Sequence, residues 1–472
     1  MLSISTKFFS FLLIGLAFVT CSIEPENKND TSNLPQFWLS NTDKSAMFKK
    51  QTFLQNITTD ASTQTIVINE NEKFQSIDGF GCALTGGSAI LLNKMNASNK
   101  AALLKELFAA DENNIGMSYL RISIGASDLS DRVFSYNDMP IGQTDTAMVN
   151  FSIEPEKKDL IPVLKEILAI NPNIKILGSP WSAPVWMKTN NSSIGGSLKL
   201  QYYPAYAKYF VKYIQQMKAE GIRIDAITIQ NEPLHGGNNP SMLMQAAEQT
   251  LFIKKHLGPA FESNKIDTKI IIYDHNADRT DYPITVLNDP EAKKYVDGSA
   301  FHLYAGSISD LSKVHLAHPD KSIYFTEQWI GAPGNFAQDL KWHIKNLFIG
   351  GTLNWCRNVI EWNLASDHNL KPHTIGGCTQ CLGAITINGN TVTRNPAYYI
   401  IAHASKFVRP GSVRIESTYL NNLPNVAFKT PDGKTALIVL NDTQSVQIFK
   451  IKVGANTYSS ILNAGSVGTY VL

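Results

Sequence analysis

The chain has 472 residues, of which 43% are hydrophobic, and its 42 basic side chains nearly balance 40 acidic ones. This length allows one large domain and a smaller one, each with a buried core. A formal net charge of +2, without a long basic run, argues against nucleic acid as the main partner. The seventeen tyrosines and seven tryptophans fit a sugar-binding surface, although aromatic side chains more often belong to the core.

Residues 1–21 have the pattern of an export signal. Lys7 supplies positive charge, and residues 8–19 form an apolar core that is too short to span a bilayer comfortably. Cys21 would carry lipid in a bacterial lipoprotein, but Phe18-Val-Thr20 is a poor lipobox, so ordinary secretory cleavage is the alternative. We therefore expect export to the bacterial cell envelope, as a periplasmic protein or outer-membrane lipoprotein, or secretion, with membrane contact only through lipid on Cys21. The polar residues 22–35 predict a disordered tether.

Four further cysteines, Cys82, Cys356, Cys378 and Cys381, are too few for a disulfide framework. The last two have the spacing of a zinc-ligand pair, but no second pair of cysteine or histidine residues accompanies them. We expect a local disulfide or two free thiols at this position. The sequence predicts no metal, nucleotide or organic cofactor.

Strand-like runs alternate with helical stripes over residues 74–395. The stripes include one around Leu164 and another around Phe210, and Gly221 and Gly258-Pro259 are typical helix ends, whereas Asn239-Pro240 is typical of a helix start. A (β/α)8 barrel is therefore predicted; a doubly wound sheet is the alternative, but no Gly-rich phosphate loop follows the first strand. The eight strand candidates are Gln75–Thr85, Met117–Gly125, Ile174–Ser179, Ile224–Gln230, Thr268–Asp274, Gly298–Tyr304, Ser322–Thr326 and Asn358–Asn363.

Short alternating runs broken by turn residues follow over residues 396–472. This pattern predicts an antiparallel sheet folded as a β-sandwich. Thr65–Ile68 has the same character, so we expect residues 36–73 to contribute to the same domain. The expected C-terminal strands are Val413–Glu416, Val426–Lys429, Thr435–Leu440, Val446–Val453 and Tyr458–Leu462.

Two of the barrel strands end in a glutamate. The fourth candidate leads into Asn231-Glu232, and the seventh leads into Glu327. Active-site residues of such barrels gather at the carboxyl ends of the strands, and the fourth and seventh strands lie nearly opposite each other. Two facing carboxyl groups suit glycoside hydrolysis, in which one donates a proton to the leaving oxygen. A separation of ~5–5.5 Å predicts nucleophilic attack with retention, whereas ~6.5–9.5 Å predicts inversion.

The motifs QNEP, at Glu232, and TEQW, at Glu327, resemble glycoside hydrolase family 30, which includes glucosylceramidases and β-1,6-glucanases. The resemblance extends from about Phe37 to Leu472 and implies that the flanking strands form one β-sandwich packed against the barrel. It also implies that Glu232 is the general acid/base and Glu327 the nucleophile. Five further stretches stand in the expected order: Ile77–Gly81, Tyr119–Ser123, Gly178–Asn190, Phe301–Tyr304 and Glu361–Leu364.

Several further polar residues are candidates for the site. By the resemblance, Asn231 would hold the sugar 2-hydroxyl, with capping of its loop as the alternative, and Tyr304 would donate a hydrogen bond to the nucleophile or simply close the barrel rim. Arg121 ends a strand pointing into the barrel mouth, and we expect it to position a carboxylate by paired hydrogen bonds. His302 faces the same side as Tyr304 and could join that network. Asp128 is a candidate hydroxyl ligand or a turn former.

Tryptophans supply the candidate stacking surfaces. We expect Trp181 and Trp362 to stack on glucose rings, because an aromatic face suits the C–H surface of the sugar. Trp186 and Trp329 are as likely to belong to the core as to the site.

The first barrel strand departs from the glucosylceramidase pattern. It normally leads into Thr-Asp, and that Asp holds the far hydroxyls of the glucose, but Gly86 stands there in this chain. Gly86 and Gly87 are expected to leave space for another sugar attached through O6. The hypothesis is therefore a retaining endo-β-1,6-glucanase acting on pustulan-type or fungal cell-wall β-glucan. An exo-acting β-glucosidase or glucosylceramidase is the alternative, and a non-catalytic glycan-binding lipoprotein is a third possibility.

Overall fold

The computed structural model describes residues 35–53 and 57–472. The predicted export signal and nearly all of the predicted tether therefore lie outside the described residues. In the part of the chain that is described, no helix is long and apolar enough to cross a membrane.

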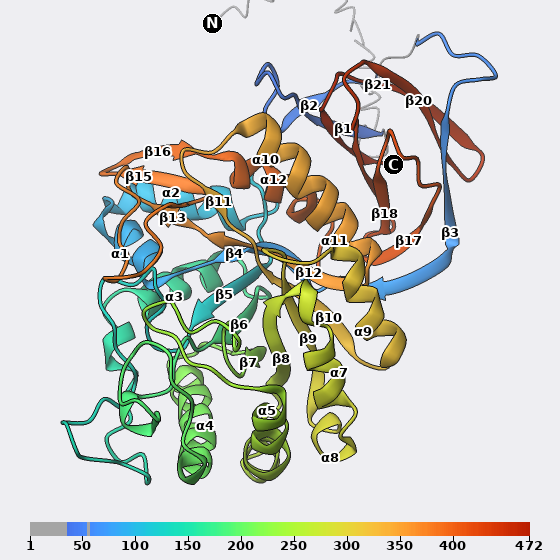
Figure 1. Ribbon diagram of the computed structural model, residues 1–472. Coiled ribbons are helices and arrows are strands. Elements are labelled where there is room, and N and C mark those ends of the chain that lie inside the picture. Colours follow the sequence, from blue (N-terminus) through green and yellow to red (C-terminus); the bar gives the residue numbers. More distant parts are fainter. Residues whose placement is uncertain (1–34, 54–56) are drawn as a thin grey trace, which may run out of the picture. The chain divides into compact units, whose positions relative to one another are not determined.

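Eight parallel strands close into a barrel, as the sequence predicts (Figure 1). Each expected run overlaps one of them, because each carries apolar residues on both faces and is buried. The first strand begins at Gly79 instead of Gln75, since Ser76 still belongs to a preceding strand and pairs with Val413. The barrel strands are β4 (Gly79–Ala83), β5 (Tyr119–Ser123), β6 (Lys175–Ser179), β7 (Ala226–Thr228), β8 (Lys269–Asn276), β9 (Val296–His302), β10 (Ser322–Glu327) and β12 (Cys356–Asn363).

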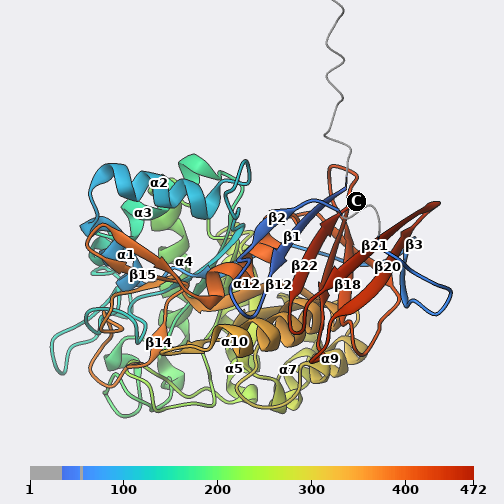
Figure 2. The same cartoon turned by 90° about the horizontal axis from the view of Figure 1, so that it is seen from above.

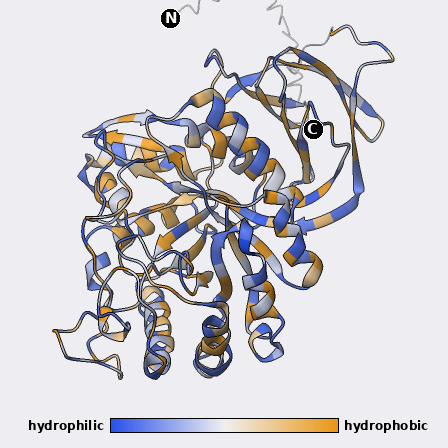
Figure 3. Cartoon of the chain, in the orientation of Figure 1, coloured by the Kyte–Doolittle hydropathy of each residue, from blue (hydrophilic) through white to orange (hydrophobic). Residues whose placement is uncertain are grey.

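Helices surround these strands, and Figure 3 shows polar and apolar residues alternating along them. In α4 the predicted stripe around Phe210 is buried, which is how an amphipathic helix covers a barrel. The helices of the barrel region are α1 (Gly86–Lys94), α2 (Ala97–Phe108), α3 (Leu160–Ile170), α4 (Tyr203–Ala219), α5 (Ala246–Phe252), α6 (Gly258–Ser263), α7 (Asp281–Leu287), α8 (Pro290–Lys293), α9 (Leu311–Ala317), α10 (Phe336–His343) and α11 (Gly350–Leu353).

The expected bounds of the helix after β7 were wrong at both ends. The helix begins at Ala246, where the Gln245 N–H donates to the Glu248 carboxylate, and not at Asn239-Pro240. It also continues past Gly258-Pro259, because a π-helical turn over residues 253–257 joins α5 to α6. Pro259 lies in the first turn of α6, where a missing N–H costs little.

Nine strands from both ends of the chain form a second sheet (Figure 2). Its neighbouring strands are antiparallel except β3 and β20, which run parallel. Phe37, Phe449 and Tyr470 belong to the apolar cluster of this sheet. In sheet order the strands are β2 (Lys49–Gln51), β1 (Gln36–Ser40), β22 (Val467–Val471), β19 (Thr435–Leu440), β18 (Asn425–Lys429), β17 (Val413–Ser417), β3 (Thr65–Ser76), β20 (Gln447–Val453) and β21 (Asn456–Leu462).

The region expected to be β-sandwich from residue 396 begins instead with a helix, α12 (Pro396–Ser405). Its buried His403 bonds Ser40 of β1 through Nε2 and Thr469 of β22 through Nδ1, both at 2.8 Å. Helix α12 also packs on β4 and α10. It therefore joins the sheet to the barrel. Short strands complete the fold: β11 (Ile330–Gly331) with β14 (Cys381–Leu382), and β13 (Ala365–Ser366) with β15 (Ile385–Asn388) and β16 (Thr391–Arg394).

Candidate active site

Glu232 and Glu327 lie next to each other at the carboxyl ends of the barrel strands. Glu327 is the last residue of β10, and Glu232 follows β7 by four residues. One carboxylate oxygen of each lies within 4.8 Å of the other. Both are buried and line a cavity of about 330 Å³. The sequence prediction that two strand-end carboxyl groups face each other is therefore matched by the geometry.

The loop after β7 sets the position of Glu232 through its backbone. Glu232 has a φ of 47°, which is uncommon for a residue with a side chain. Its N–H donates to the Asp274 carbonyl at 2.9 Å, and the Asn231 N–H donates to the Pro180 carbonyl at 2.8 Å. These bonds, to β8 and to the residue that follows β6, hold the loop against the barrel rim.

Arg121, in β5, is fully buried beneath the cavity and contacts four polar side chains. It donates to Oε2 of Glu327 at 2.5 Å and to Oδ2 of Asp274 at 2.8 Å. It also donates to Oδ1 of Asn231 at 2.6 Å and to Ser179 at 3.1 Å. The expectation that Arg121 positions a carboxylate matches this geometry, but it reaches two different carboxylates with one N–H each and does not line the cavity.

Asp274, in β8, organises the base of the site, and the sequence reasoning gave it no role. A β-bulge lies here, because Tyr273 pairs with Ala300 whereas His275 pairs with Phe301, and Tyr273 and Asp274 both have positive φ. The fully buried carboxylate of Asp274 accepts hydrogen bonds from Arg121 and from the hydroxyls of two threonines, Thr228 and Thr326. Burial raises its pKa, but Arg121 and His302 lower it well below its ordinary value.

His302, at the end of β9, joins Asp274 to Glu232. Its Nε2 lies 3.1 Å from Oδ1 of Asp274 and its Nδ1 lies 3.2 Å from Oε1 of Glu232. Burial lowers the pKa of His302, but Glu327, Asp274 and Glu232 outweigh burial and raise it to about 9. His302 is completely buried, and the expected contact with the carboxylate network is present.

The two glutamates face different partners. Burial raises the pKa of Glu232, but the hydrogen bond and charge of His302 bring it below its ordinary value. Burial raises the pKa of Glu327, although His302 and Arg121 oppose this. With Arg121 and Tyr304 both donating to Glu327, its ionised form has both oxygens hydrogen-bonded. His302, whose pKa is raised, holds a dissociable proton beside Glu232, with its Nδ1 3.2 Å from Oε1 of that residue.

Comparison with known proteins agrees with this geometry. Residues 77–408 match the family model described as the glycosyl hydrolase family 30 TIM-barrel domain, and residues 411–470 match its beta sandwich domain.

The chain belongs to glycoside hydrolase family 30.

Its relatives include an endo-1,6-beta-D-glucanase of Aspergillus fumigatus, 36% identical over 426 residues that cover 84% of this chain and 85% of that one. The mouse lysosomal acid glucosylceramidase is 30% identical, with 80% and 77% covered. Among solved structures, the endo-beta1,6-glucanase BT3312 is similar with a TM-score of 0.87 and 36% identity, covering 93% of this chain and 98% of that one. The protein is therefore a glycoside hydrolase with the family 30 barrel and sandwich.

Tyr304 and Asn231 present polar groups to the family 30 cavity. The Tyr304 hydroxyl donates to Oε1 of Glu327 at 3.0 Å, as the resemblance implied. Asn231 uses Oδ1 to accept from Arg121, so its NH₂ group is left to donate. This orientation suits a sugar hydroxyl beside the nucleophile.

The tryptophans differ from expectation in their exposure. Trp181 and Trp362 line the cavity but are 2% and 5% exposed, stack on each other at 5.4 Å and lie against the Arg121 guanidinium. Trp329 lines the same cavity and is more exposed, so it offers more ring surface to a sugar. Trp186 is core, and its indole N–H donates to the Asn137 carbonyl.

Asp128 lies in the wall of the cavity beside the only disulfide of the described residues. The N–H of Cys378 donates to Oδ2 of Asp128 at 3.2 Å, and Cys378 is bonded to Cys381. Burial, with Glu327 and Glu232 nearby, raises the pKa of Asp128 to about 7. Of the alternatives left open for these cysteines, the structure therefore has the disulfide.

The space expected at Gly86 and Gly87 is absent. Neither residue lines the cavity. A Cβ on Gly87 would lie 2.6 Å from the Leu129 carbonyl oxygen, and one on Gly86 would lie 3.2 Å from the Ser130 hydroxyl. These glycines therefore allow close packing of α1 against the loop after β5, and Gly86 is not a substrate-binding residue in this structure.

Glu232, His302 and Glu327 also satisfy the distances of a three-ligand metal group. A metal ligand must be unprotonated, and the carboxylates around His302 favour its protonated form. The Arg121 guanidinium beside Glu327 adds a fixed positive charge that opposes a second cation. The residues present therefore fit proton transfer better than metal binding.

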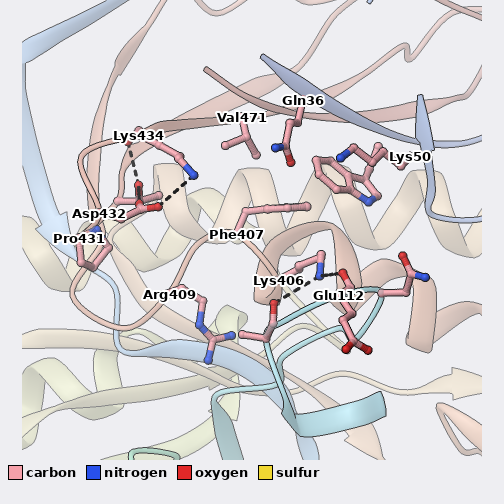
Figure 4. Close-up of a pocket in the computed structure, with 14 residues that line it drawn as sticks. Gln36, Lys50, Glu112, Lys406, Phe407, Arg409, Pro431, Asp432, Lys434 and Val471 are labelled. Atoms are coloured by element: carbon pink, nitrogen blue, oxygen red, sulfur yellow. Dashed lines mark hydrogen bonds and ion pairs between the residues drawn. The ribbon is translucent and has the colours of Figure 1, made fainter. Parts of the chain in front are cut away.

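A larger cavity of about 660 Å³ lies elsewhere, lined by the segment after α12, the loop after α2 and the nine-stranded sheet (Figure 4). It is lined by Lys50, Lys406, Arg409 and Lys434, with Glu112 and Asp432 as its carboxylates. Asp432 pairs with Lys434 at 3.4 Å and Glu112 pairs with Lys105 at 3.5 Å. No two carboxyl groups face each other across it, so this cavity lacks the equipment for glycoside hydrolysis.

Proposed function

We propose that the protein is an endo-β-1,6-glucanase that cleaves β-glucan with retention at the anomeric carbon. The observation that carries this proposal is the pair of carboxyl groups, Glu232 and Glu327, with oxygens within 4.8 Å of each other. That distance fits the ~5–5.5 Å of retaining glycosidases and is shorter than the ~6.5–9.5 Å of inverting ones.

In the first step, an oxygen of Glu327 attacks the anomeric carbon while the bond to the leaving oxygen breaks. Glu232 gives its proton to that oxygen, so the leaving sugar departs as an alcohol and a glycosyl ester remains on Glu327. In the second step, Glu232 accepts a proton from water, the water oxygen bonds to the anomeric carbon, and Glu327 is released. Neutralising Glu327 in the ester removes a negative charge beside Glu232 and makes Glu232 a suitable base.

The surroundings of Glu232 favour a sugar over a lipid as leaving group. Four polar residues line the cavity here: His235, Asn238, His275 and Asn276. A ceramide chain would need apolar surface at this place, whereas a second glucose presents hydroxyls to such side chains. The relatives named endo-1,6-beta-D-glucanases also share more identity with this chain, 34–36%, than those named glucosylceramidases, 27–31%.

The test is a product profile. Protein without residues 1–21 is incubated separately with linear β-1,6-glucan, an aryl β-glucoside and glucosylceramide. We expect a ladder of gentiooligosaccharides from the glucan, and the β-anomer as first product by NMR. Glucose as the sole product, with faster turnover of the lipid or the aryl glucoside, would instead establish the exo-acting alternative.

We also propose that the protein is exported and carries lipid on Cys21. The apolar run of residues 8–19 supports export, and the disulfide between Cys378 and Cys381 fits an oxidising compartment. The lipid rests on Cys21 following that run directly, although Phe18-Val-Thr20 is a poor lipobox, and ordinary secretory cleavage is the alternative. Labelling of expressing bacteria with radioactive palmitate should mark the wild type and not Cys21→Ser. Equal labelling of both proteins would contradict the lipid, and retention of the full-length chain in the cytosol would contradict export.

A further inference from the structure

Strand β8 continues past Asp274 into two residues that line the catalytic cavity, His275 and Asn276. The bulge at Tyr273 and Asp274 shifts the register here, so the strand end is turned relative to a regular barrel strand. Neither His275 nor Asn276 takes part in the two chemical steps derived above. His275 lies on the side of the cavity occupied by Glu232.

His275 offers a single hydrogen-bond donor to the cavity. It is 7% exposed, and its Nδ1 is buried without a hydrogen-bond partner. A proton on Nδ1 would leave a buried N–H unpaired, so the favoured tautomer carries its proton on Nε2. Burial lowers the pKa of His275 to about 4, which keeps the ring neutral at higher pH.

The Nε2 atom lies 4.0 Å from Oε1 of Glu232. This separation is too long for a direct hydrogen bond, so the N–H is available to a group that enters beside Glu232. A side chain with one unpaired buried nitrogen contributes less to stability than an apolar ring of the same shape. His275 is therefore better explained by what it binds than by the fold.

Asn276 adds a second donor next to it. Its Oδ1 accepts the Tyr304 N–H at 3.0 Å, which fixes the orientation of the amide. The Nδ2 group has no partner among the hydrogen bonds of the described residues and belongs to a side chain that lines the cavity. His275 and Asn276 thus hold two neighbouring donors in the wall of the catalytic cavity.

We infer that His275 and Asn276 form the subsite for the leaving-group sugar and donate hydrogen bonds to its hydroxyls. The inference rests on the proposed function, because Glu232 protonates the oxygen that joins this sugar to the rest of the chain. Because Nε2 of His275 lies 4.0 Å from Glu232, its N–H can reach hydroxyls of the sugar that carries the leaving oxygen. The ligand class is a glucosyl unit, bound through its hydroxyls.

The first test compares substrates with and without a sugar in this place. The kcat/KM of gentiotriose is divided by that of an aryl β-glucoside for wild type and His275→Phe, which keeps the ring and removes the donor. We expect the ratio to fall about tenfold, the loss typical of one hydrogen bond in a transition state. His275→Gln, which can donate from its amide, should recover part of the ratio.

His315→Phe is the matched control, because His315 stacks on Trp355 at 3.8 Å outside the cavity, and its ratio should equal that of wild type. Asn276→Asp keeps the acceptor for the Tyr304 N–H and removes the amide donor, so it should lower the ratio as well. An unchanged ratio in both His275→Phe and Asn276→Asp would overturn the inference. An equal fall in kcat/KM on both substrates would also overturn it, because His275 would then act only through Glu232 and not by binding the sugar.

A transfer assay separates this inference from the proposed linkage. An aryl β-glucoside forms the glycosyl ester, and added gentiobiose or methyl β-glucoside then competes with water from the leaving-group subsite. We expect transfer products from wild type and about tenfold less transfer, relative to hydrolysis, from His275→Phe. If the protein transferred glucose but cleaved no β-1,6-glucan, the proposed endo-β-1,6-glucanase activity would be wrong, whereas the inferred leaving-group subsite would stand. Equal transfer by both proteins, or none by wild type, would reject the subsite.

Discussion

Glu232 and Glu327 are the same residue type in one cavity, and their partners distinguish them. Glu327 faces Arg121, a cation that does not lose its proton under working conditions. Glu232 faces His302, a group that does exchange protons. Arg121 places a fixed positive charge beside Glu327, whereas His302 places a dissociable proton beside Glu232. These contacts support the proposal that Glu232 is the acid/base and Glu327 the nucleophile.

Glu232→Gln should therefore lose the proton transfer and keep the binding surface. We expect kcat on β-1,6-glucan to fall about 10³-fold, within the range for removal of a general acid. Steady-state kinetics together with glucan-binding isotherms measure both properties. If Glu232→Gln turned over glucan as fast as the wild-type protein, the acid/base assignment would be contradicted. If the wild-type protein itself bound glucan but did not cleave it, the non-catalytic interpretation would be supported.

His302 predicts a loss of stability at alkaline pH. Its pKa of about 9 in the folded protein lies above its ordinary value of 6.5 because of the surrounding carboxylates. Protonated His302 therefore stabilises the fold fully below about pH 6.5, and this contribution is lost as pH rises through 9. Thermal unfolding of wild type and His302→Gln between pH 6 and 10 should show a difference in Tm that shrinks with increasing pH. A constant difference would show that His302 is neutral in the folded protein.

At the scale of one element, the single strand β8 supplies three residues to the active site. One bulged strand supplies Asp274 to the network below the cavity and His275 and Asn276 to its wall. The positive φ of Tyr273 and Asp274 stores strain that the surrounding hydrogen bonds must hold. Arg121, His302 and the two threonines that donate to Asp274 provide that restraint.

Asp274→Asn should lower both the free energy of unfolding and the catalytic activity. It keeps the size of the side chain but leaves Arg121 with one buried carboxylate partner fewer, which typically costs about 3 kcal/mol or more. The free energy of unfolding from urea denaturation measures this loss. Asp267→Asn is the control, since Asp267 is 84% exposed and pairs with Arg223 at 3.4 Å, and should change stability by less than about 0.5 kcal/mol. Similar losses in both variants would contradict the role given to Asp274.

The same strand shows where sequence reasoning ends. Its apolar run 270–273 predicts a buried strand, and all eight barrel strands could be located in this way. Glu232 and Glu327 could be located because they end such runs. No glycine marks the position of the bulge in the sequence, and the bulge depends on contacts with β9 and with Arg121. The roles of Asp274 and His275 were therefore missed. Gly86 was misjudged because its neighbour Ser130 comes from a loop whose path the sequence does not indicate.

At the scale of the whole molecule, the two ends of the chain share one sheet. Strand β1 pairs with β22, and β3 lies between β17 and β20. His403 of α12 bonds both β1 and β22 from the barrel side. Barrel and sheet are therefore expected to gain stability from each other.

Calorimetry should show one unfolding transition for residues 36–472. Removal of residues 411–472 would leave β1 and β3 without their hydrogen-bonded neighbours β22, β17 and β20, so this shortened chain should show no cooperative transition. Far-UV circular dichroism and tryptophan fluorescence should follow the same curve for the longer chain. Two separated transitions, or a folded barrel without residues 411–472, would contradict this interdependence.

The pairing of β1 with β22 also sets an order of events during synthesis. Gln36 pairs with Val471 of β22, so β1 has no partner on that side until the ribosome has made β22. The sheet can therefore be completed only after β22 has been made, whereas the barrel strands become available one by one. The chain stays incompletely folded until then, and an incompletely folded chain is the form that the proposed export across a membrane requires.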